Sequence, residues 1–180
     1  MKDNNFLYHD ILRRYDRHRK DHPDRQAEHC KEQNNLASAI YYAACGIDAE
    51  KKLHNHQFRI GYEHAKKFAQ HLQLFEKEID SAKDFKELYD TVWRHRIHKI
   101  GALTVYDTAQ RIGEFKKLYP VEIFLHCGSR QGAINLFGAI GKKDMLPVTD
   151  FPKEWVDANL TAHDIENILC IYKDHFKLLF

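Results

Sequence analysis

Residues 62–79 read YEHAKKFAQHLQLFEKEI and show the clearest structural pattern in the chain. Apolar side chains recur here at intervals of three and four residues, which places them on one face of an α-helix. The stretch therefore predicts an amphipathic helix whose apolar face packs into a core. The side chains on that face are Tyr62, Ala65, Phe68, Ala69, Leu72, Phe75 and Ile79.

The same helical period continues on both sides of this stretch. The sequence has only 4 prolines and 8 glycines, and no segment alternates cleanly between apolar and polar residues, so we predict an all-α protein. The segment 121–125 (VEIFL) is either a buried turn of helix or a short extended piece, and 141–152 is expected to be a loop. Helices are predicted over 6–20, 24–45, 49–60, 84–96, from the hairpin described below to just before Pro120, over 128–140, and from Thr161 to the C-terminal end.

The length of 180 residues fits one compact helical domain over 1–180, with N-terminal helices in 1–80, a hairpin region in 84–140 and a C-terminal packing helix in 152–180. No apolar run approaches the roughly 18 residues that a membrane span needs, and the first residues lack a signal peptide. Four cysteines lie far apart without a metal-binding spacing. We expect a cytoplasmic protein without membrane contact, metal or other cofactor; a homo-oligomer is possible.

The overall charge does not by itself indicate a polyanionic partner. With 28 basic and 26 acidic residues the formal net charge is only +2. The basic residues are nevertheless concentrated locally, because residues 94–99 read RHRIHK and precede a glycine and a new helix. The prediction of a nucleic-acid partner depends on this cluster.

Residues 97–101 (IHKIG) are predicted to form a hairpin between two helices. A tight turn that enters a helix directs unpaired backbone N–H groups and the positive end of the helix dipole outward, which suits a phosphate. Gly101 allows the backbone to approach a ligand closely. Arg94, Arg96, His98 and Lys99 add cations around it. The alternative is a purely structural corner between helices.

This stretch resembles the helix-hairpin-helix motif of DNA-binding and DNA-repair proteins. In that family an apolar residue, a proline and a Gly-hydrophobic-Gly hairpin precede a helix with small residues on its inner face. The matching residues here are Ile97, Ile100, Gly101, Thr104 and Ala109. The resemblance implies that Ile100, Gly101 and Thr104 belong to the phosphate-binding element.

The sequence also departs from that family. His98 replaces the usual proline and Lys99 the first hairpin glycine, which leaves open whether the hairpin carbonyls bind a monovalent cation. The helix-hairpin-helix DNA glycosylases, which are all-α, have in their lyase members a lysine where this chain has Leu103. Their aspartate falls near Leu125 or His126 here, and neither position carries a carboxylate.

Two residues remain as candidates for acid–base catalysis, Glu122 and His126. Ser129 and Arg130 begin a predicted helix and form a candidate second anion site. The sequence leaves open whether the chain is an enzyme. It predicts a DNA-binding protein that contacts backbone phosphate with little sequence preference. The alternatives are a monofunctional DNA glycosylase-like or nucleotide-processing enzyme, and a protein-interaction module without a nucleic-acid role.

Overall fold

The computed structural model describes residues 4–179, without the side chains of 55–57 and 178–179. It is mostly helical, with one two-stranded antiparallel sheet, which confirms the predicted all-α character apart from the sheet. The chain divides into two compact units. The central unit comprises Asp24–Tyr119, and the terminal unit combines Met1–Pro23 with Pro120–Phe180. That division does not follow the predicted segments 1–80, 84–140 and 152–180, and a single domain over 1–180 stays a prediction.

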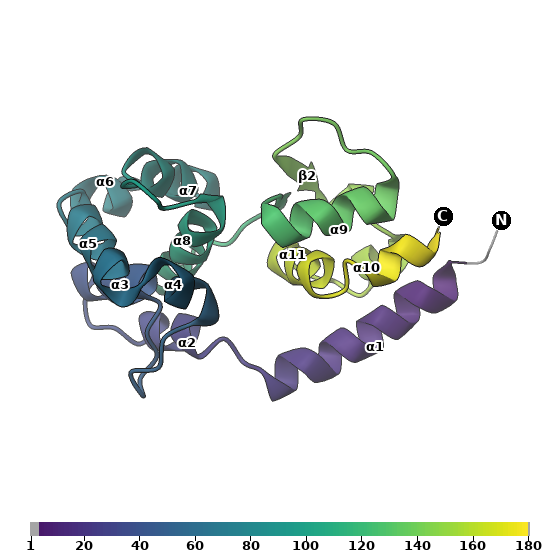
Figure 1. The fold of residues 1–180 in the computed structure, drawn as a ribbon, viewed down its shortest axis with the longest axis horizontal. Helices are drawn as coiled ribbons and strands as arrows, with labels where there is room; N and C mark the ends of the chain where they lie inside the picture. The colour runs from purple at the N-terminus through teal and green to yellow at the C-terminus, as the bar shows by residue number, and fades with distance from the viewer. Residues whose placement is uncertain (1–3, 180) are drawn as a thin grey trace. The chain divides into compact units, whose positions relative to one another are not determined.

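The central unit is a bundle of helices. Figure 1 shows α3 between α5 and α8, and α3 packs on both of them. Its elements are α2 (Arg25–Lys31), α3 (Leu36–Cys45), α4 (Asn55–Ile60), α5 (Tyr62–Gln73), α6 (Glu76–Ser81), α7 (Phe85–Arg94) and α8 (Ala102–Lys116).

The predicted apolar stripe of residues 62–79 forms the core, but on two helices instead of one. Ala65, Phe68 and Leu72 on α5 are fully buried, and Ile79 on α6 is buried as well. Helix α5 ends at Gln73 and α6 begins at Glu76; Leu74, between them, is 77% exposed. The stripe is confirmed as the buried face except at Tyr62, which is exposed at the start of α5, and at Phe75, which is half-buried; the single helix through residue 79 is wrong.

A second break divides the predicted helix 24–45 into α2 and α3. Asn35 caps the new helix, because its side-chain oxygen accepts a hydrogen bond of 2.9 Å from the backbone N–H of Ser38. The predicted end of this segment is confirmed, since Gly46 takes the left-handed conformation with φ of 63° directly after α3. Between 49 and 60 only the short α4 forms.

The terminal unit combines helices with the small sheet. Strands β1 (Glu122–Phe124) and β2 (Met145–Pro147) pair antiparallel, with Ile123 opposite Leu146. The segment 121–125 is therefore extended, and the predicted loop 141–152 contains its partner strand. The other elements are α1 (Asn5–Asp21), α9 (Cys127–Phe137), α10 (Lys153–Asp157), α11 (Ala162–Ile171) and the 3₁₀ helices η1 (Val148–Asp150) and η2 (His175–Leu179).

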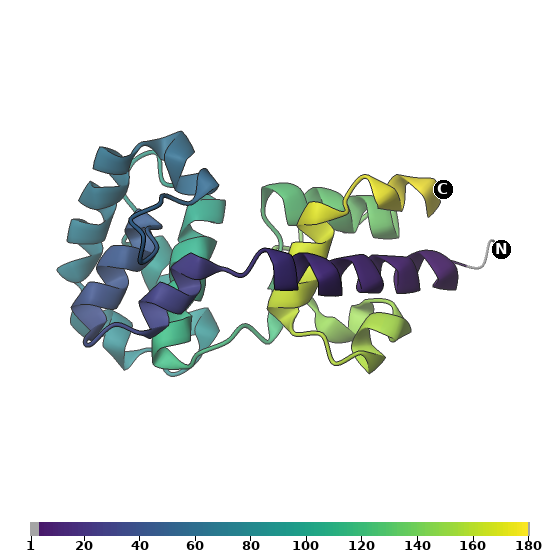
Figure 2. The same cartoon turned by 90° about the horizontal axis from the view of Figure 1, so that it is seen from below.

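The core of the terminal unit lies between α1, the sheet and α11. Fully buried side chains come from several elements, including Ile11, Ile123, Trp155, Ile165 and Phe176. In Figure 2 the unit is seen from below, with α1 crossing it; α1 packs on α10. Apolar side chains far apart in the sequence therefore share one core, which explains why residues 1–23 join residues 120–180.

Two glycines let α9 approach α11 closely. A Cβ atom at Gly132 would overlap the carbonyl oxygen of Leu169, and one at Gly128 would press on the sulfur of Cys170. Side chains at these positions would force the helices apart. The last helix ends at Ile171 and a 3₁₀ helix follows, so the predicted continuous helix to the C-terminal end is too long.

Candidate nucleic-acid interface

The hairpin is formed by residues 95–101 between α7 and α8, which pack on each other. Asp84, one of two candidate caps with Ser81, caps the start of α7 by accepting a hydrogen bond from Glu87 N–H at 2.8 Å. The backbone N–H of Ile100 donates to the carbonyl of Ile97 at 3.1 Å and closes the turn. The side chain of Ile100 is buried, so it anchors the hairpin and leaves the neighbouring residues outside.

Lys99 and Gly101 give the hairpin its backbone shape. Lys99 has φ of 66°, in the left-handed region that favours glycine. This is the position at which the helix-hairpin-helix motif has its first glycine. Gly101, by contrast, has φ of −94°, and no atom lies within 4 Å of a Cβ built there. The fold does not require glycine at 101, and the backbone at the start of α8 is accessible to a ligand.

Four of the predicted phosphate-binding side chains are exposed on this hairpin: Arg94, Arg96, His98 and Lys99. The first two are held by neighbours. Arg94 forms an ion pair of 3.1 Å with Glu78 on α6. The guanidinium of Arg96 lies over the ring of Trp93, 3.9 Å from its centroid. The structure thus brings these cations together at one end of α7 and α8.

Two residues that the sequence analysis did not single out support the hairpin from other helices. His64 on α5 lies with Nε2 2.6 Å from the carbonyl oxygen of His98; a carbonyl only accepts, so Nε2 donates. Glu78 contacts both Arg94 and, at 2.9 Å, His95. The hydrogen bond from His95, with Arg94 beside it, lowers the pKa of Glu78, which keeps that carboxylate ionised.

Thr104, which the resemblance assigns to the phosphate-binding element, does not offer its side chain to a ligand, because that side chain is buried. Thr104 lies in the first turn of α8 with 6% of its surface exposed, and its carbonyl accepts a hydrogen bond from the Thr108 hydroxyl. The small side chain at this position faces the core of the central unit. Only its backbone N–H belongs to the free start of the helix.

The predicted second anion site at the start of α9 is also corrected. Ser129 is fully buried, and its hydroxyl bonds backbone groups of His126 and Phe124 instead of a ligand. Arg130 forms an ion pair of 2.7 Å with Asp144. Both side chains therefore serve the local fold, because one closes the helix start and the other attaches α9 to the segment before β2.

The two candidate catalytic residues lie in the terminal unit, whereas the hairpin lies in the central unit. Glu122 is the first residue of β1, and His126 is the cap residue before α9. The imidazole of His126 is buried, with Nε2 3.3 Å from a carboxylate oxygen of Glu166, which is buried too. The sequence analysis did not identify Glu166. The sequence did offer one indication of it, because Glu166 is a charged residue among the apolar residues that α11 buries.

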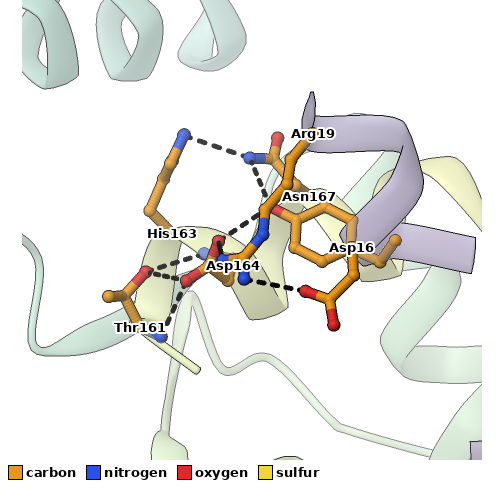
Figure 3. A network of polar contacts seen from close by, with 7 residues as sticks. Asp16, Arg19, Thr161, His163, Asp164 and Asn167 are labelled. Carbon is orange, nitrogen blue, oxygen red and sulfur yellow. Dashed lines mark hydrogen bonds and ion pairs between the residues drawn. The ribbon is translucent and has the colours of Figure 1, made fainter. Parts of the chain in front are cut away.

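A polar network of the terminal unit joins α1 to the start of α11 (Figure 3). The hydroxyl of Tyr15 donates to Asp164 at 2.9 Å, and Asn167 donates to Tyr15 at 3.4 Å. Thr161 and Asp164 form a capping box at the predicted start of the last helix. Burial and the neighbouring Asp164 carboxylate raise the pKa of Tyr15, so its hydroxyl stays protonated and remains a donor.

Within residues 4–179, no helix is both long and apolar enough to cross a membrane. Among the side chains that the structure describes, no three His, Cys, Asp or Glu residues gather in a cluster suited to a metal ion. Comparisons with protein-family models, curated proteins and solved structures found no match to this chain.

Proposed function

We propose that this chain is a DNA-binding protein whose hairpin, residues 95–101, contacts backbone phosphate. The observation that carries the proposal is the grouping of exposed Arg94, Arg96, His98 and Lys99 beside the unobstructed backbone of Gly101. Side-chain cations and backbone N–H groups at the start of a fifteen-residue helix attract the same kind of ligand, a phosphate oxygen.

The character of these groups favours binding with little sequence preference. Lysine and arginine contacts to phosphate fix the position of a protein on DNA but carry no information on the bases. The hairpin presents no Asn or Gln side chain, the residue types that read adenine edges. Glu78 neutralises part of the positive charge at the base of the hairpin, so we expect moderate affinity, carried mainly by Lys99 and the start of α8.

Fluorescence anisotropy with a labelled duplex tests the proposal. For three phosphate contacts, raising the salt from about 50 to about 200 mM should weaken binding about 40-fold. Lys99→Glu should weaken binding strongly, and Lys99→Glu combined with Gly101→Asp should abolish it. Lys142→Glu is the matched control, because it changes the net charge equally at an exposed position of the other unit.

The possible results separate the alternatives. Absence of binding by the unmodified protein at the lower salt, to the labelled duplex and to a labelled single strand of the same sequence alike, would refute the DNA proposal and leave the hairpin as a structural corner. Equal losses in Lys99→Glu and Lys142→Glu would mean that net charge, and not the hairpin, attracts DNA. The glycosylase-like alternative needs a base-release assay on damaged duplex, with Glu122→Gln as the test variant. The buried position of His126 favours a structural role for that residue.

A further inference from the structure

Three planar groups form a ladder beside the hairpin. The rings of Tyr89 and Trp93, one helical turn apart on α7, are stacked with an interplanar angle of 15° and centroids 6.2 Å apart. The guanidinium of Arg96 lies over the indole of Trp93, 3.9 Å from its centroid. Arg96 is exposed, and the ladder ends in its guanidinium plane.

The ladder is held in place before any ligand binds. Tyr89 and Trp93 are fixed by α7, and Nη1 of Arg96 donates a hydrogen bond of 2.8 Å to the carbonyl of Trp93. The turn bond from Arg96 N–H to the same carbonyl, at 3.3 Å, fixes the backbone as well. A ligand that stacks on Arg96 does not need to order a freely rotating side chain, which reduces the entropic cost of binding.

The orientation of Arg96 indicates what it recognises. A guanidinium that clamps phosphate turns its donor edge toward the ligand. Arg96 uses part of that edge on a protein carbonyl, and its Cζ lies 3.9 Å from the centroid of the Trp93 ring, so the exposed side of the guanidinium is free to contact a planar ligand. Planar cationic and aromatic faces are the surfaces on which nucleic-acid bases stack. In a duplex those base faces are covered by neighbouring bases, whereas in a single strand they are available.

We propose that the preferred ligand of the hairpin is single-stranded DNA, with one base stacked on the outer face of Arg96 and the adjacent phosphate at Lys99 and Gly101. This inference rests on the proposed function, since it assigns the DNA form bound at the same site. Stacking on Arg96 would not distinguish one base from another, because every base has a face that can stack.

The test measures how tightly the whole 180-residue chain binds two single strands of equal charge. One is an oligomer of about 12 thymidines, and the other is an abasic deoxyribose-phosphate oligomer of the same length. Fluorescence anisotropy should show the thymidine oligomer binding about tenfold more tightly. Comparing two single strands avoids the higher charge density of a duplex. Arg96→Lys keeps the charge and removes the plane, so it should remove this preference and leave abasic binding within about threefold.

Lys99→Glu is the matched variant for the phosphate contact, and it should weaken both oligomers by a similar factor. Thermal unfolding of Arg96→Lys checks the fold, which should be unchanged because Arg96 is exposed. If neither oligomer binds but the duplex does, the proposed function survives and this inference is refuted; if no form of DNA binds, both fail. If both bind equally, the proposed function survives and the stacking site is refuted. A preference that persists in Arg96→Lys also refutes the role of the ladder.

Discussion

The Nε2 atom of His64 donates a hydrogen bond of 2.6 Å to the carbonyl oxygen of His98, although the two residues are 34 positions apart. His64 stands in the first turn of α5, and His98 lies in the hairpin. The helix that carries the clearest apolar stripe in the sequence therefore also supports the loop on which the proposed function depends. The position of α5 in the core therefore fixes His64, and His64 in turn holds the backbone of the hairpin at His98.

His64→Ala should loosen the hairpin. A lost hydrogen bond of this kind costs about 1 kcal/mol, so affinity for DNA should fall roughly fivefold, and the Ile100 amide should exchange faster with solvent. His64→Gln keeps a donor at nearly the same place and should restore most of both properties. Hydrogen exchange and anisotropy on the three proteins measure this. Unaltered exchange in His64→Ala would mean that the hairpin keeps its shape without the bond.

Gly101→Asp should abolish DNA binding without destabilising the fold. Position 101 caps α8, has no obstruction around a Cβ atom and does not use a left-handed conformation. Aspartate is a better cap than glycine, so the free energy of unfolding should stay equal or rise by a few tenths of a kcal/mol. DNA binding should be lost, because the carboxylate repels phosphate. Urea unfolding and anisotropy test both parts, with Gly101→Ser as the uncharged control.

The sequence was sufficient to predict most of the fold because local signals dominate it. The buried positions of α5 followed from spacing alone, and Asp84 and Thr161 marked the starts of α7 and α11. An extended piece at β1 was one of two alternatives and β2 was missed, since three residues are too few to show an alternating pattern. The break at Leu74 was missed because Phe75 and Ile79 continue the spacing of three and four residues across it.

The site was predictable in part for a similar reason. The cations of residues 94–99 are adjacent in the sequence, so their grouping needed no knowledge of the fold. Their partners Glu78 and His64 come from α6 and α5, and nothing in a surface glutamate or histidine indicates which loop it will contact. Thr104 matches a small inner-face position of the hairpin motif and is buried, so only its backbone was a candidate for phosphate contact.

Gly132→Ala should destabilise the terminal unit. The added methyl group would overlap the carbonyl oxygen of Leu169, and neither helix backbone can move without disturbing the core. We expect a loss of about 1–3 kcal/mol or more in the free energy of unfolding. Trp155 is fully buried in this unit and reports its unfolding by fluorescence in a Trp93→Phe background. Gly101→Ala is the control, and an equal effect of the two would refute the close-packing argument.

Asp164 should make the terminal unit sensitive to acid. Burial alone would raise its pKa, but hydrogen bonds from Thr161 and Tyr15 outweigh that effect and lower it (Figure 3). A carboxyl group whose pKa is lower in the folded state stabilises the fold fully above its unfolded pKa of about 3.9. That contribution is lost as the pH falls through the lower folded value.

Urea unfolding followed by Trp155 fluorescence at about pH 5 and about pH 3 measures this effect, because the interval spans the unfolded pKa of aspartate. The unmodified protein should lose more stability over the interval than Asp164→Asn, which has no carboxylate to protonate. Tyr15→Phe removes one donor to the carboxylate and should fall between them, with its folded pKa closer to the ordinary value. If all three proteins lose the same stability between these pH values, Asp164 does not control the acid response of this unit.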